Sequence, residues 1–282
     1  DGVKTLDNVK LKKITSILKA FSFEVVGTTG FSNSQVTAGG LAVSSFYNST
    51  MMSKAYKNLY AIGEILDIDG INRVCLNGKP IFLHGVLDQG YFSDGIYTPA
   101  SPQGYESDIL TMKRLGFNML RKHIKIEPDY FYYACDKLGM LVFQDFINSG
   151  KYSFRIDTAL PTAGLRRGLT HRATKRRRNI FFATGEAMVE QLYNHPCVCY
   201  YTIFNEGWGQ FETKQMVDLT RSLDNTRLID YASGGNFIKC SGDILDLHNY
   251  PHPEMYLYDK DYINILGEYG GIGWPVQGHL WQ

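Results

Sequence analysis

The sequence predicts an α/β fold, a (β/α)8 barrel of the TIM type, over residues 71–282. Two observations predict it. From residue 71 onward, short apolar runs of strand length alternate with stretches of helical periodicity, an order typical of a parallel sheet. Polar side chains follow these runs one after another. Functional residues beyond the carboxyl ends of many strands are typical of a barrel, whereas an open sheet gathers them at one switch point.

Seven strands are expected, at residues 81–86, 117–121, 140–143, 198–204, 228–231, 244–247 and 263–266. Helices, with apolar residues three and four positions apart, are expected at 107–115, 128–138, 179–194 and 212–223. A closed barrel has eight strands, so the barrel is expected to be truncated before the eighth, which would lie beyond Gln282. Because an open barrel exposes sheet edges, such a chain is expected to be a poor or inactive enzyme.

Two further segments interrupt the alternation of strands and helices. Residues 148–178 read as a long irregular insertion that ends in the basic run 175–178. The solvated first turn of a helix is the favoured interpretation of that run, and a phosphate-binding patch is the alternative. Residues 1–70 are rich in Gly, Ser and Thr, typical of tight turns between short strands. The sequence therefore predicts two domains, a small N-terminal segment of unrelated fold (1–70) and the barrel (71–282).

Composition excludes several classes of partner. A net charge of +1 gives no reason to expect nucleic acid, and no apolar run is long enough to span a membrane. The five scattered cysteines are expected to be reduced thiols, which favours a reducing, cytoplasmic location. The oligomeric state is left open.

The strongest chemical signal is the pair Asn205-Glu206 at the end of a buried strand, followed by Gly207 and Trp208. Glycoside hydrolysis needs a carboxylic acid that protonates the leaving oxygen. Trp208 is expected to raise the pKa of Glu206 by desolvation. Asn205 can hydrogen-bond the 2-hydroxyl group of a sugar.

A second carboxylate, Glu268, also ends an apolar strand and is followed by glycines. Two carboxylates that converge across a barrel mouth fit a double displacement, in which one attacks the anomeric carbon while the other moves protons. Their carboxyl groups are then expected about 5–5.5 Å apart. Either Tyr269 or Tyr250 could hydrogen-bond the nucleophile.

Six segments in order, 76–86, 116–123, 135–142, 193–196, 205–206 and 267–270, make residues 71–282 resemble the catalytic barrel of glycoside hydrolase family 2. This is the family of β-galactosidases, β-glucuronidases and β-mannosidases. The resemblance implies a carbohydrate substrate and retention of configuration, with Glu206 as general acid/base and Glu268 as nucleophile. From the resemblance and from positions after predicted strands, the substrate-binding candidates are His84, Arg121, His123, Asp145, Asn205, Trp208, His248, Tyr250, Tyr269 and Trp274. The family normally has two β-sandwich domains before the barrel, and neither is expected within residues 1–70. No cofactor and no metal ion is expected.

Residues 1–70 instead resemble the C-terminal part of aminoacetone-oxidase-like, FAD-dependent flavoproteins, on segments 30–40, 50–54 and 58–70. The glycine fingerprint of dinucleotide binding is missing from the sequence, so these residues are not expected to bind FAD. Two alternative functions stay open beside a glycosidase. They are a fragment of an FAD-dependent oxidoreductase and a catalytically dead, carbohydrate-binding barrel.

Overall fold

The computed structural model describes residues 64–68, 70–76, 79–148, 150–160, 170–250 and 252–271. Most of the predicted N-terminal segment, with its flavoprotein resemblance, and the candidate Trp274 lie outside these ranges. Within them, none of the helices has the length and apolar character that crossing a bilayer would require.

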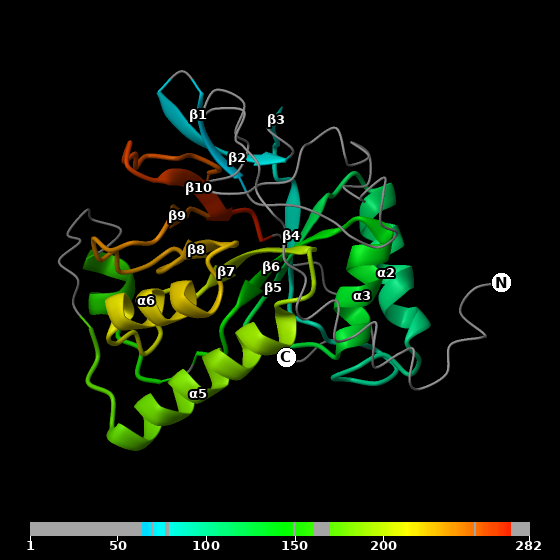
Figure 1. The fold of residues 1–282 in the computed structure, drawn as a ribbon, viewed down its shortest axis with the longest axis horizontal. Coiled ribbons are helices and arrows are strands. Elements are labelled where there is room, and N and C mark those ends of the chain that lie inside the picture. Colours follow the sequence, from blue (N-terminus) through cyan, green and yellow to red (C-terminus); the bar gives the residue numbers. More distant parts are fainter. Residues whose placement is uncertain are drawn as a thin grey trace, which may run out of the picture. The chain divides into compact units, whose positions relative to one another are not determined.

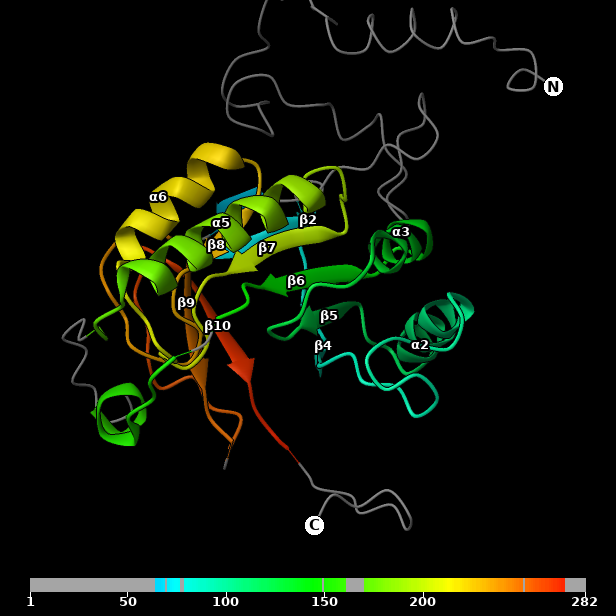
Figure 2. The ribbon, with the colours of Figure 1, turned by 90° about the horizontal axis from the view of Figure 1, so that it is seen from below.

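One curved sheet dominates the described part (Figures 1 and 2). Its seven strands are β4 (Gly85–Asp88), β5 (Met119–Lys122), β6 (Leu141–Asp145), β7 (Val198–Thr202), β8 (Leu228–Asp230), β9 (Ile244–His248) and β10 (Ile263–Glu268). Each strand pairs in parallel with its neighbour along the chain. This sequential, all-parallel order is that of a barrel and confirms the predicted α/β barrel class.

Four helices connect the first strands and lie along one side of the sheet (Figure 2): α2 (Gln103–Arg114), α3 (Asp129–Leu138), α5 (Lys175–Leu192) and α6 (Thr213–Leu223). The main apolar cluster lies between these helices and the strands. Helix α3 ends at Gly139, whose left-handed backbone (φ 70°) lets its amide donate to the carbonyl of Cys135. The basic run 175–178 forms the first turn of α5, as the favoured interpretation predicted, and Thr174 caps that turn.

A small antiparallel sheet precedes the barrel: β1 (Glu64–Ile68), β2 (Ile71–Leu76) and β3 (Lys79–Pro80). Val74 of β2 and Leu83 pack against a second apolar cluster, which includes the first residues of β6, β8, β9 and β10. These segments therefore cover the sheet near its amino-terminal edge. Because β1 pairs with β2, the small sheet joins both sides of residue 70, and the division into two domains there stays a prediction.

The first barrel strand was predicted four residues too early. Strand β4 begins at Gly85, whereas the amide of Ile81 donates to Val74 of the small sheet and Phe82 is 80% exposed. The apolar run 81–86 thus serves two sheets, and only its end enters the barrel. His84 consequently stands before the amino end of β4, where its ring packs on Phe117.

Candidate active site

The candidate site lies at the carboxyl edge of the sheet, where side chains at the ends of β5, β9 and β10 meet those that follow β7. Glu206 stands in a tight turn after β7, in the left-handed region (φ 50°) that side chains other than glycine seldom adopt. Its amide donates to the carbonyl of Ser233, and Asn205 forms a parallel bridge with Ser233. The turn is therefore held against the end of β8, with the Glu206 carboxylate partly exposed. Backbone strain of this kind is concentrated at functional sites.

Arg121 of β5 hydrogen-bonds several side chains of the site, and only 2% of its own side chain is exposed. Its Nε and Nη2 donate to the two oxygens of Asp145 at 3.1 and 3.2 Å, and Nη2 also donates to Asn205 at 2.8 Å. Its Nη1 donates to Glu268 Oε1 at 3.0 Å. One guanidinium group thereby fixes three of the predicted site residues relative to one another.

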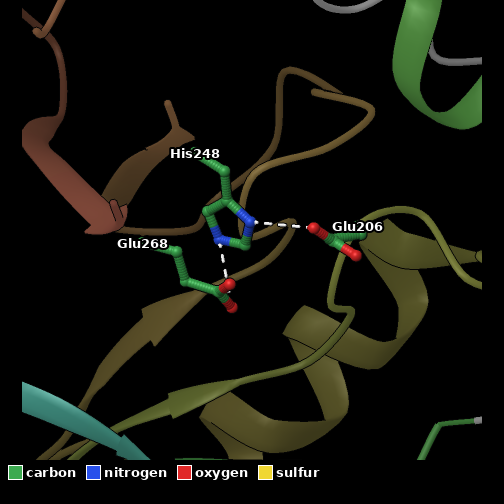
Figure 3. A group of neighbouring side chains, drawn as sticks. All are labelled: Glu206, His248 and Glu268. Atoms are coloured by element: carbon green, nitrogen blue, oxygen red, sulfur yellow. Dashed lines mark hydrogen bonds and ion pairs between the residues drawn. The ribbon is translucent and has the colours of Figure 1, made fainter. Parts of the chain in front are cut away.

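His248, the last residue of β9, lies between the two candidate catalytic carboxylates (Figure 3). Its Nδ1 is 3.2 Å from Glu206 Oε1, and its Nε2 is 3.6 Å from Glu268 Oε1. Ser233 Oγ, at the end of β8, is 2.8 Å from the same Nε2. The imidazole therefore links the predicted acid to the predicted nucleophile.

The pKa of Glu206 moves in the direction opposite to the prediction. The hydrogen bond with His248 holds the pKa of this carboxyl group below its ordinary value and outweighs the desolvation, which acts upward. Trp208 does not enclose the carboxylate as expected, because the indole is itself 42% exposed and packs beside Tyr152. The prediction depended on desolvation by Trp208, whereas the hydrogen bond with His248 decides the direction.

Of the two tyrosines considered for the nucleophile, Tyr250 is the one that contacts it, since its hydroxyl group donates to Glu268 Oε2. Desolvation, followed by this hydrogen bond, raises the pKa of Tyr250, so the phenol stays protonated as a donor. Tyr269, the residue after Glu268 in the chain, is half exposed. Both oxygens of Glu268 thus accept hydrogen bonds, one from Arg121 and one from Tyr250.

His123 completes the edge of the site. Its Nε2 lies 3.9 Å from Asp145, and its Nδ1 contacts Gln89 at 3.3 Å. Desolvation lowers the pKa of His123, which favours a neutral ring. His84 is not brought to this group, because it precedes β4 and the strand's carboxyl end is Asp88. Gln89, which follows β4 and contacts His123, was not predicted as a site residue because the first strand was predicted in the wrong phase.

The insertion between β6 and α5 supports the turn that carries Glu206. Asn148 Nδ2 donates to the carbonyl of Trp208, and Lys151 accepts from the amide of Gly209. Buried Asp157, paired with His171 at 2.8 Å, lies so close to Gly207 that a Cβ there would come within 3.1 Å of it. The predicted irregular insertion therefore helps to hold the Glu206 turn in place, a role that its sequence did not indicate.

Glu206, His248 and Glu268 each offer one atom within 4.8 Å of the others, a spacing that a metal ion could use. Two contacts argue against a cation there. The guanidinium group of Arg121 already pairs with Glu268, and the imidazole presents a different nitrogen to each carboxylate. The arrangement suits proton transfer beside a nucleophilic carboxylate better than it suits metal binding.

Comparison with known proteins gives the family. A family model described as "Glycosyl hydrolases family 2, TIM barrel domain" matches residues 67–262. A β-glucuronidase of Bacteroides fragilis is 26% identical over 219 residues, which are 66% of this chain and 29% of that protein. The crystal structure of a glycosyl hydrolase family 2 member from Bacteroides cellulosilyticus has a TM-score of 0.46 and 19% identity, over 68% of this chain and 22% of its own. The chain thus spans less than a third of the length of either relative.

A shorter match is the ribosomal RNA dihydrouridine synthase of Haemophilus influenzae, 31% identical over 68 residues, which are 24% of this chain and 17% of that protein. It shows no family for residues 1–70, and the flavoprotein resemblance there stays a prediction.

Proposed function

Because the chain belongs to glycosyl hydrolases family 2, we propose that it is a retaining β-glycoside hydrolase, with Glu206 as general acid/base and Glu268 as nucleophile. The substrate is a carbohydrate in β-glycosidic linkage. The sugar stays open, because the resemblance covers galactosides, glucuronides and mannosides alike.

One observation carries the proposal. Glu206 and Glu268 come from different strands, yet an oxygen of each lies within 4.8 Å of the other at the carboxyl edge. Retaining glycosidases hold their carboxyl groups about 5–5.5 Å apart, whereas inverting enzymes leave about 6.5–9.5 Å for a water molecule. The spacing supports direct attack by one carboxylate.

In the first step, Glu268 attacks the anomeric carbon while the bond to the aglycone breaks and Glu206 protonates the departing oxygen. Arg121 and Tyr250 orient the attacking carboxylate through the hydrogen bonds that they donate to its two oxygens. In the second step, Glu206 takes a proton from water, whose oxygen replaces Glu268 on the anomeric carbon. Asn205, whose Oδ1 accepts a hydrogen bond from Arg121, is proposed to bind the 2-hydroxyl group of the sugar.

The test compares aryl β-glycosides of graded leaving-group ability in wild type, Glu206→Ala and Glu268→Ala. Glu268→Ala abolishes turnover of all of them. Glu206→Ala loses about 10²–10⁴-fold on poor leaving groups and far less on good ones, which need no proton. Glu254→Ala, an exposed carboxylate in the loop after β9, is the control and leaves turnover unchanged.

Equal losses on good and poor leaving groups in Glu206→Ala would remove Glu206 from the acid role. Sugar binding by calorimetry without turnover would favour the catalytically dead, carbohydrate-binding barrel. Flavin absorbance in the purified protein would favour the oxidoreductase fragment.

A further inference from the structure

The His248 ring contacts three residues of the site at once: Glu206, Ser233 and Glu268. We propose that His248 and Glu206 share one proton and act together as the acid/base unit, with Ser233 and Asp246 fixing the tautomer of the imidazole. The inference rests on the proposed hydrolase function and names a positioning residue for its proton transfer. It follows from the direction of each hydrogen bond around the ring.

The chain of hydrogen bonds begins at Asp246 of β9, which is completely buried. Its Oδ1 accepts from the amide of Gly267 at 2.7 Å, and its Oδ2 accepts from Ser233 Oγ at 2.5 Å. Two donors, the Gly267 amide and the Ser233 hydroxyl group, thus face Asp246, while burial, and next the charge of Asp246, raise the pKa of the neighbouring Asp230. Asp246 is then the acceptor, and the single hydroxyl proton of Ser233 points toward it.

Because that proton is committed, Ser233 Oγ can only accept from His248. Its distance of 2.8 Å from Nε2 therefore places a proton on Nε2. Arg121 Nη1 lies 3.4 Å from the same nitrogen, but it already donates to Glu268 Oε1 at 3.0 Å. Glu268 Oε1, 3.6 Å from Nε2, is a second acceptor on the side where this proton lies. The tautomer of neutral His248 is fixed as Nε2–H.

Nδ1 then faces Glu206 Oε1 at 3.2 Å with one proton between them. The proton resides either on the carboxyl group, which donates to a neutral imidazole, or on Nδ1, which donates to a carboxylate. Removing it would leave a lone pair against a negative oxygen, so the pair retains the proton to higher pH than the carboxyl group alone. The lowered pKa of Glu206 reflects the second of these forms.

The surroundings keep the ring in place. The His248 side chain is 4% exposed, and a Cβ at Gly234 would lie 2.1 Å from the ring, so the absence of that atom makes room for it. Three charged or titratable groups face the ring besides Glu206: Arg121, Glu268 and, with its ring 6.3 Å away, Tyr250. Arg121 and Glu268 lie on the Nε2 side with opposite charges, whereas Glu206 faces Nδ1.

One proton moves through Glu206 in each of the two steps. When the glycosidic bond breaks, Glu206 gives its proton to the aglycone oxygen, and His248 is left neutral with its proton on Nε2. When water attacks the glycosyl-enzyme, its proton passes to Glu206 and is shared again with Nδ1, while the freed carboxylate of Glu268 leaves the anomeric carbon. Over the full cycle, the proton that Glu206 gives to the aglycone is replaced by one from water, so the site ends with the protons with which it began.

The experiment is ¹⁵N NMR of the full chain with labelled histidine, in wild type, Glu206→Gln and Ser233→Ala, assigned with His248→Asn. We expect neutral His248 to be the Nε2–H tautomer in wild type. In Glu206→Gln the pH midpoint of its signals falls by about 1–3 units, because the carboxylate that stabilises the imidazolium form is gone. In Ser233→Ala the Nδ1–H tautomer gains population. His195, whose Nδ1 is 2.8 Å from Asp136, is an internal control in the same samples and does not move.

An Nδ1–H tautomer in wild type, or an unmoved midpoint in Glu206→Gln, would overturn the proposal. Neither result requires turnover, so failure of the pair and failure of the hydrolase function are separate outcomes. Where turnover is measured, His248→Asn moves the alkaline limb of kcat/KM for poor leaving groups to lower pH by about 2 units, the ordinary difference between an imidazole and a carboxyl group. A purely structural role would lower the rate without moving that limb.

Discussion

Arg121→Lys tests whether the geometry of the guanidinium group, rather than its charge, holds the site together. The substitution keeps one positive charge at a position with 2% exposure. It removes the planar fork that allows Nε, Nη1 and Nη2 to reach three acceptors at once. Asp145, itself 1% exposed, depends on two of these donors.

The expected loss in free energy of unfolding follows from the hydrogen bonds that Arg121 makes. Arg121 makes four hydrogen bonds to side-chain oxygens, at 2.8, 3.0, 3.1 and 3.2 Å. A lysine ammonium group at the end of a different stem can replace at most about two of them. The loss of two charge-assisted hydrogen bonds, at about 1.5–3 kcal/mol each, predicts destabilisation of about 3 kcal/mol or more, a large share of the stability of an ordinary domain.

Equilibrium unfolding in urea measures this loss. The matched control is Arg178→Lys, which changes an exposed arginine paired with Glu212 at 2.5 Å and is expected to cost less than about 1 kcal/mol. A loss in Arg121→Lys no larger than that in the control would refute the reasoning, because it would mean that charge alone satisfies the buried acceptors.

Three further predictions concern single contacts. Tyr250→Phe removes a donor to Glu268 and lowers kcat about 10–100-fold, the equivalent of one hydrogen bond to a charged group, while thermal unfolding stays nearly unchanged because Tyr250 is 48% exposed. Equal kcat values would show that the hydroxyl group does not act on the nucleophile. Gly234→Ala places a Cβ 2.1 Å from the His248 ring at φ 58° and destabilises the fold by about 1–3 kcal/mol in urea. Wild-type stability would mean that the ring moves freely. The pKa of Glu206 is lower in the folded chain than its ordinary 4.5, so its carboxylate stabilises the fold above about pH 4.5, and this contribution is lost as pH falls through the folded value. Urea unfolding should therefore show the stability advantage of wild type over Glu206→Gln at pH 7 and its disappearance in acid; an advantage that grows in acid would reverse the assigned sign.

The barrel class could be predicted from sequence because periodicity is local. Strands β5 to β10 lie within a few residues of the predicted runs, and α3 ends at the predicted Gly139. Helix α5 begins four residues before the predicted start, since its first turn is charged and carries no apolar periodicity. Strand β4 was predicted in the wrong phase because Ile81 and Leu83 are apolar for another reason, which is that they pack with residues of the small sheet against the second apolar cluster. An apolar run indicates that a segment packs in the interior, but it does not indicate which of two sheets the segment joins.

The sequence could predict a site residue only where it predicted the end of the strand that carries it. Arg121, Asp145, Asn205 and Glu268 each follow or end a strand, so their meeting was expected from topology. The pairing of His248 with Glu206 joins residues 42 positions apart, and the support of the Glu206 turn by the insertion depends on an irregular segment. Neither has a local pattern in the sequence. The direction of the Glu206 pKa was wrong for this reason.

The two glutamates are chemically the same residue, so the different roles that we propose for them must come from their neighbours. Glu268 accepts from Arg121 on one oxygen and from Tyr250 on the other, and two donors suit an ionised group that attacks. Glu206 instead faces an imidazole nitrogen, which can hold a proton or receive one. The Arg121 guanidinium group is bonded directly to Glu268 and reaches Glu206 only at longer range. Exchanging the two roles would require the cation to change partners, and buried Asp145 holds it in place with two hydrogen bonds. The proposed assignment of acid and nucleophile therefore depends on β5 and β6, two strands that carry neither glutamate.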